Sequence, residues 1–103
     1  MPRIRIREDE PVPIQFRASD RDLICDLDLV DSSYVTRLEP TADSSELVGR
    51  FTLGELDDLL GCIAAKANHT EDRRLERQLD SLFGRVRKTM RRYDDGLWQD
   101  SAL

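Results

Sequence analysis

The chain has 103 residues, 36% of them charged, and a formal net charge of −5 at pH 7. This length predicts a single domain over residues 1–103 with one modest core, and with a C-terminal tail at 94–103. The negative charge argues against a protein that coats nucleic acid. The sequence has no window of about 18 apolar residues, so we expect no membrane-spanning helix.

The first residues contain no apolar stretch typical of a secretory signal. We therefore expect a cytoplasmic protein, in which Cys25 and Cys62 stay reduced instead of forming a disulfide. Both cysteines fall on apolar faces of the expected elements and are interpreted as small core residues.

The first half of the chain alternates between apolar and polar residues, which is the pattern of strands that bury one face. Five runs show it, at 3–7, 12–17, 22–29, 34–39 and 46–51. A turn at Ser19-Asp20 would set Phe16 opposite Leu23 and Ile14 opposite Cys25, so that inward residues meet. The later turns can be matched in the same way.

We therefore predict an antiparallel meander of four to five strands over residues of about 3–51. Residues 3–7 would add the fifth strand at the edge, beside Ile14 and Phe16.

The second half predicts two amphipathic helices, at about 53–67 and about 71–93. Thr52 and Glu55 fit a capping box before the first helix. The apolar stripe of the second helix is formed by Leu75, Leu79, Leu82, Phe83, Val86, Met90 and Tyr93. The predicted class is therefore α+β, with an αα-hairpin packed on one face of the sheet.

The predicted second helix is longer than the predicted strands. About 23 helical residues span roughly 34 Å, whereas a strand of about 7 residues spans roughly 23 Å. We therefore expect the C-terminal half of this helix to extend beyond the sheet.

Isolated residues give weak signals for catalysis. His69 and Asp72 lie close in sequence and can be drawn as a base–carboxylate pair, but an exposed turn histidine is the simpler interpretation. Asp26 and Asp28 lie about 6.6 Å apart on one strand face and can be drawn as ligands of a divalent cation. A charge-paired, solvated sheet face is the simpler interpretation of this pair.

No other pattern indicates a cofactor or metal. The chain lacks C-x-x-C spacing, a glycine-rich phosphate loop, and the nucleophile-elbow and zinc-helix motifs. We therefore expect no cofactor and no enzymatic activity.

The second helix ends in a dense basic run. Its members are Arg85, Arg87, Lys88, Arg91 and Arg92. They can form a solvated helix end favoured by the helix dipole, or bind an acidic protein surface, or contact phosphates of a nucleic acid. Trp98, in the acidic tail that follows, is either a docking residue or folds back on the hairpin.

The sequence thus favours a small non-catalytic binding or accessory protein, acting through protein–protein contacts of the second helix and Trp98. We expect these contacts to include self-association into a homo-oligomer. The alternative is a nucleic-acid-binding regulator that uses the basic run. A metal-dependent enzyme based on Asp26 and Asp28 is a third interpretation.

Overall fold

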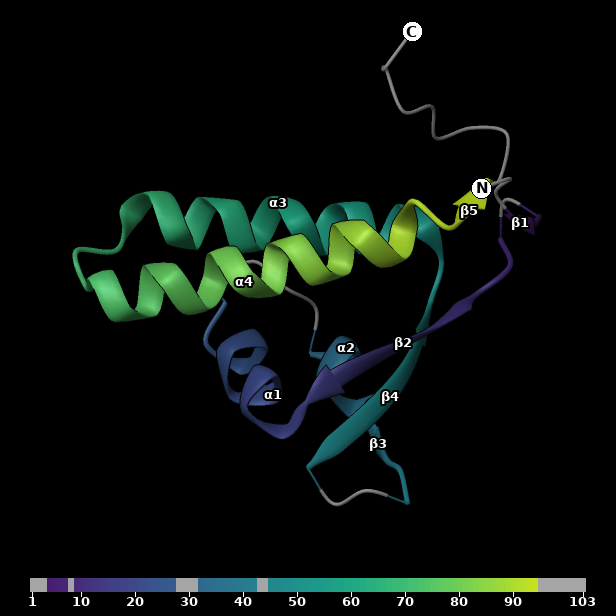
Figure 1. Ribbon diagram of the computed structural model, residues 1–103, viewed down its shortest axis with the longest axis horizontal. Helices are drawn as coiled ribbons and strands as arrows, with labels where there is room; N and C mark the ends of the chain where they lie inside the picture. Colours follow the sequence, from purple (N-terminus) through teal and green to yellow (C-terminus); the bar gives the residue numbers. More distant parts are fainter. Residues whose placement is uncertain (1–3, 8, 28–31, 43–44, 95–103) are drawn as a thin grey trace, which may run out of the picture.

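The computed structural model describes residues 4–7, 9–27, 32–42 and 45–94, and it confirms the α+β class. The hairpin of two long helices lies over a small sheet, with shorter helices beside the sheet (Figure 1). In chain order the elements are β1 (Ile4–Arg5), β2 (Val12–Arg17), α1 (Ala18–Cys25), α2 (Ser33–Thr36), β3 (Glu39–Pro40), β4 (Glu46–Phe51), α3 (Leu53–His69), α4 (Arg73–Met90) and β5 (Tyr93–Asp94).

The main sheet has three antiparallel strands in the order β2–β4–β3. β2 and β4 pair along their whole length, with Val12 opposite Phe51 and Phe16 opposite Leu47. Every second residue of β2 is buried, so the period-two pattern correctly predicts both strands. Their partnership is different from the predicted one, because the expected meander does not form.

The prediction of a strand over 22–29 is wrong where the structure describes it, since α1 occupies this part of the chain. The carboxylate of Asp20 accepts a hydrogen bond from the backbone N–H of Arg17 at 2.7 Å, which closes the first helical turn. Ile24 and Leu27 are buried, whereas Cys25 is exposed. The predicted core position of Cys25 is therefore wrong as well.

The predicted strand over 34–39 is also wrong, because α2 takes its first three residues and β3 begins only at Glu39. Tyr34 and Leu38 are both buried. Residues four apart lie on one face both in a strand and in a helix. A short apolar pattern with this spacing therefore fits either structure, and the sequence could not decide between them.

The two-residue strand β1 lies apart from the main sheet. It pairs in parallel with β5, with Ile4 opposite Tyr93, and the N–H of Ile4 donates to the carbonyl of Arg92 at 2.7 Å. The predicted place of this strand beside Ile14 is therefore wrong. The pairing instead brings the beginning of the described chain to the end of α4 (Figure 1).

The predicted αα-hairpin is confirmed. Thr52 Oγ1 accepts a hydrogen bond from the N–H of Glu55 at 3.1 Å, and Glu55 Oε1 accepts one from the N–H of Thr52 at 2.9 Å. This is the expected capping box. The second helix begins at Arg73, with Asp72 as its N-cap, and ends at Met90.

One apolar core joins the hairpin to the sheet and to α1. Val86 and Met90, in the last turns of α4, are fully buried. The C-terminal half of α4 therefore presents a covered apolar stripe, and only its polar side faces solvent. Among the described helices, none combines the length and the apolar character needed to cross a membrane.

Candidate functional site

The middle of α4 is joined to α1 by an ion pair between Arg85 and Asp20. Asp20 is 2% exposed and is the only charged residue that is buried in the described part of the chain. Its two carboxylate oxygens accept hydrogen bonds from the two terminal nitrogens of Arg85, at 2.6 and 2.8 Å. This is the bidentate geometry in which a guanidinium binds a carboxylate most strongly.

The same carboxylate also completes the first turn of α1 through the N–H of Arg17. The hydrogen bonds that Arg85 donates to Asp20 raise the pKa of Arg85 above its ordinary value. Arg85 Nε is buried and has no hydrogen-bond partner among the described residues. Arg85 is the member of the predicted basic run whose guanidinium points toward α1 and binds Asp20.

The other predicted basic residues, Arg87, Lys88, Arg91 and Arg92, are exposed at the C-terminal end of α4. Within the described chain, Arg87, Lys88 and Arg92 form no ion pair. Trp98, the remaining predicted binding residue, lies outside the described residues.

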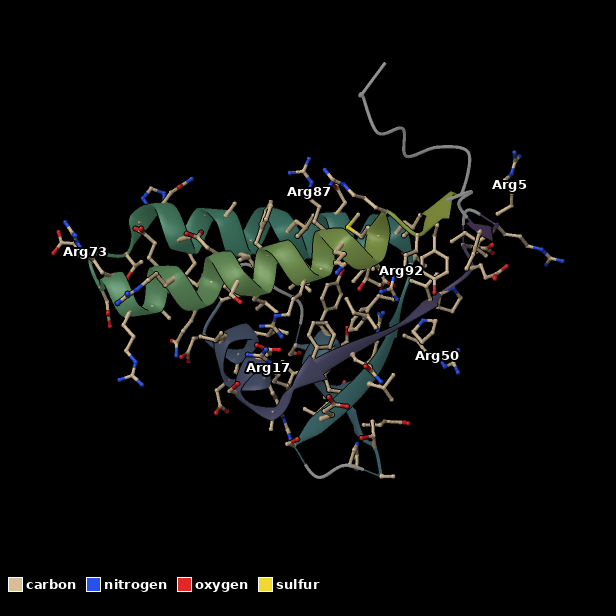
Figure 2. The ribbon with its side chains drawn as sticks, in the orientation of Figure 1. Arg5, Arg17, Arg50, Arg73, Arg87 and Arg92 are labelled. Atoms are coloured by element: carbon tan, nitrogen blue, oxygen red, sulfur yellow. The ribbon has the colours of Figure 1, made fainter. Side chains whose placement is uncertain are left out.

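Two arginines from distant segments join this end of the molecule. The pairing of β1 with β5 brings Arg5 next to the end of α4. Arg50 lies near the end of β4, two residues before the N-cap of α3, and the start of α3 lies near the end of α4 because the hairpin is antiparallel. In Figure 2, Arg5, Arg50 and Arg92 lie at this end, and Arg87 lies nearer the middle of the hairpin. We name Arg5, Arg50, Arg87, Lys88, Arg91 and Arg92 the basic end.

A second basic feature is a groove between α1 and α4, which we name the α1–α4 groove. It has a volume of about 500 Å³. It is lined by Arg17, Ser19, Asp20, Asp22, Leu23, Arg74, Arg77, Gln78, Ser81 and Arg85. No sequence prediction covers this groove, although the spacing of Arg74, Arg77, Ser81 and Arg85 places them on one face of a helix.

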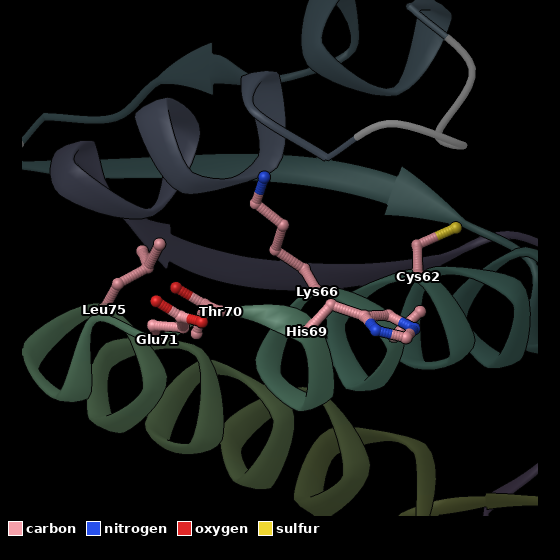
Figure 3. A pocket seen from close by; sticks show the side chains of 7 residues that line it. Cys62, Lys66, His69, Thr70, Glu71 and Leu75 are labelled. Carbon is pink, nitrogen blue, oxygen red and sulfur yellow. The ribbon is translucent and has the colours of Figure 1, made fainter.

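A third hollow of about 630 Å³ lies along the C-terminal half of α3 and the start of α4, where Cys62, Lys66 and His69 line it. Figure 3 shows the sulfur of Cys62 and the ring of His69 pointing in different directions. Burial, with a smaller effect of Asp58, raises the pKa of the Cys62 thiol. Both observations count against an activated cysteine nucleophile here.

The predicted pair of His69 and Asp72 is not formed as a hydrogen bond between described residues. Asp72 Oδ1 instead accepts the N–H groups of Arg74 and Leu75, at 2.9 and 3.2 Å, and so caps α4. His69 is exposed at the last position of α3.

The predicted aspartate pair cannot be assessed as a pair, because Asp28 lies outside the described residues. Asp26 is the C-cap of α1 and is exposed. In the described ranges, no three side chains of His, Cys, Asp or Glu come together in a way that could hold a metal ion.

Comparison of the chain with protein-family models, with curated proteins and with solved structures gave no match. The function is therefore argued from the geometry of the basic end and of the α1–α4 groove.

Proposed function

We propose that the chain is a small non-catalytic binding protein, and that its basic end contacts an acidic surface of a partner protein. The observation that carries this proposal is the exposure of Arg87, Lys88 and Arg92 without an ion pair in the described chain. Arg5 and Arg50 add like charges at the same end of the molecule (Figure 2). A carboxylate-rich surface relieves the mutual repulsion, and the planar guanidinium fork suits carboxylates.

A protein partner fits better than a nucleic acid. The chain carries a net charge of −5, which opposes the approach of a polyanion outside the basic end. Among the described residues, Ile4 in β1 is the only large apolar side chain that is strongly exposed, at 56%. An apolar residue beside arginines is typical of protein interfaces, whereas single-stranded nucleic acids are bound with exposed aromatic rings.

A symmetric homo-oligomer through this surface is disfavoured, because a two-fold axis would set the basic end of one copy against that of the other. Contact with a different, acidic protein avoids this repulsion. Catalysis is not part of the proposal, since Cys62, His69 and Asp72 supply no assembled nucleophile and base.

Affinity purification from the source cells tests the proposal with two matched variants. Arg87→Gln/Arg92→Gln removes two charges from the basic end. Arg21→Gln/Arg73→Gln removes two exposed charges elsewhere on α1 and α4. Glutamine keeps the length of the side chain and a high helix propensity. We expect a captured protein to bind about tenfold more weakly to the first variant and equally well to the second.

Equal capture by both variants would contradict the proposal. If nuclease treatment abolishes capture, the basic end binds a nucleic acid and not a protein. Binding should then also fall steeply with salt concentration. Light scattering of the purified chain at high concentration identifies the remaining alternative, which is self-association.

A further inference from the structure

We propose that the α1–α4 groove is a binding site for a small phosphate-bearing anion, held by Arg17, Arg74 and Arg77. This site is separate from the basic end, and its ligand is independent of any partner protein. The proposal rests on the charges that line the groove, on the way in which Asp20 is used, and on the beginning of α1.

Arginines outnumber acids in the groove. Four of them line it, against two aspartates. Both oxygens of Asp20 are engaged by Arg85, so this carboxylate has little capacity left for other cations. Arg17, Arg74 and Arg77 are exposed and form no ion pair within the described part of the molecule. An excess of positive charge therefore remains in the groove, and it lies on the α4 wall, because Asp22 offsets Arg17 on the opposite wall.

The arginines on the two walls of the groove come from different elements. Arg17 lies at the junction of β2 and α1 (Figure 2), whereas Arg74 and Arg77 are one turn apart on α4. Arginines that line one groove from separate elements suit a phosphate, which offers three terminal oxygens, better than a carboxylate, which one guanidinium fork already satisfies. A volume of about 500 Å³ falls within the usual range for small-molecule sites.

The beginning of α1 adds a second source of donors. Arg17 occupies the N-cap position, and its own side chain caps no N–H group of the helix, because an arginine has no side-chain acceptor. Asp20 accepts the N–H of Arg17, and the carbonyl of Ser45 accepts that of Ala18. The N–H groups that remain in this first turn, at the positive end of the helix, favour an anion. The hydroxyl groups of Ser19 and Ser81 also line the groove and supply neutral donors. Leu23 is the only large apolar lining residue, which fits a polar ligand.

The ion pair of Arg85 and Asp20 acts as the floor of this site in the proposal. It fixes α1 against α4, and so sets the spacing between Arg17 and the two arginines of α4. Its removal would alter the groove by moving the helices, so neither of its members is a suitable test residue.

Titration of the whole chain with inorganic pyrophosphate, followed by two-dimensional amide NMR at constant ionic strength, tests the site. We expect saturable shifts in residues 17–23 and 74–85, and weaker binding of inorganic phosphate. Arg77→Gln should weaken pyrophosphate binding about tenfold. The matched control Arg73→Gln, one turn earlier on α4 and outside the groove, should bind as the wild type does.

Four results would refute the site. The first is the absence of saturable shifts at millimolar pyrophosphate, and the second is equal affinity of the Arg77→Gln and Arg73→Gln variants. The third is stronger binding of citrate than of pyrophosphate, which would assign the groove to carboxylates. Shifts confined to residues 87–92 would place the anion at the basic end and would also contradict this proposal. The pyrophosphate titration gives these outcomes whether or not the affinity purification captures a partner protein, so the two proposals can fail separately.

Discussion

Arg85 and Asp20 are 65 residues apart in sequence, and they form a bidentate ion pair that ties the middle of α4 to the first turn of α1. Asp20 is almost fully buried, whereas the side chain of Arg85 is 33% exposed. A buried carboxylate with one cationic partner is tolerated in a protein interior only while that partner stays in place. The pair therefore determines where α1 lies.

Removal of the carboxylate in Asp20→Ala is expected to lower the free energy of unfolding by about 3 kcal/mol. The substitution removes the ion pair and also the hydrogen bond that closes the first turn of α1. We expect a loss at the low end of what breaking a buried ion pair usually costs, because Arg85 can turn toward water. Urea denaturation measures the change, and Asp22→Ala, at an exposed position of the same helix, should alter stability by less than about 0.5 kcal/mol.

A double-mutant cycle with Arg85→Met separates the two contributions of Asp20. If the ion pair dominates, Asp20→Ala should cost much less in the Arg85→Met background than in the wild type. Additive effects of the two substitutions would contradict the role given to the pair.

The pH dependence of stability is expected to report a second ion pair. Arg37 contacts Glu55 at 2.7 Å, between α2 and the start of α3. The hydrogen bond from Arg37 is the main cause that holds the pKa of Glu55 below its ordinary value of 4.5. The unfolded chain therefore binds this proton first as the pH falls. The stabilisation is complete above pH 4.5 and is lost as the pH falls through the folded-state pKa.

Chemical denaturation of the wild type and of Glu55→Gln, repeated from neutral pH to below pH 4.5, tests this expectation. The difference in unfolding free energy should be largest at neutral pH and should shrink in acid. In an Arg37→Met background the same comparison should lose most of its pH dependence. A difference that grows on acidification would have the wrong sign and would refute the assignment.

Local chemistry decides which parts of this fold could be predicted. The capping box of Thr52 and Glu55 and the long stripe of α4 need no distant partner, so the hairpin follows from the sequence. β2 and β4 are also predicted from their alternation, but alternation alone does not decide, because the longer alternating run over 22–29 forms part of α1 where the structure describes it. The segment with Tyr34 and Leu38 is ambiguous, since residues four apart share a face in both structures.

The candidate sites can also be divided into parts that local sequence predicts and parts that depend on distant segments. The basic run after Arg85 is visible in sequence because its members are neighbours. Arg5 and Arg50 join it only through the β1–β5 pairing and the antiparallel hairpin, which no local pattern predicts. The α1–α4 groove requires α1 to be a helix, so the mistaken strand over 22–29 concealed Arg17 as a neighbour of α4.

Gly49 is expected to be irreplaceable in the centre of β4. A Cβ atom at this position would lie 2.6 Å from Cε2 of Phe51 and 3.0 Å from Cδ2 of Leu38. Both side chains are buried and have little room to move. Gly49→Ala should therefore lower the unfolding free energy by about 1 to 3 kcal/mol, as measured by urea denaturation.

The second substitution Phe51→Leu should recover part of this loss by removing the ring that the new methyl group meets. The combined variant is then more stable than the sum of the two single effects predicts. Strict additivity would show that the cost of Gly49→Ala comes from another source, and would contradict the steric explanation.

Gly84, in the middle of α4, should behave in the opposite way. It is exposed, and a Cβ atom built there meets no atom within 4 Å. Gly84→Ala should raise the unfolding free energy by about 0.5 to 1 kcal/mol, because alanine loses less backbone entropy in a helix. Gly61→Ala, in the same environment on α3, should give a similar gain. If only Gly84→Ala fails to stabilise, and its deficit grows with protein concentration, then a second copy covers this face of α4. That result would contradict our expectation from the structure that the chain does not self-associate. It would also show that the partner surface lies on this face of α4 and not at the basic end.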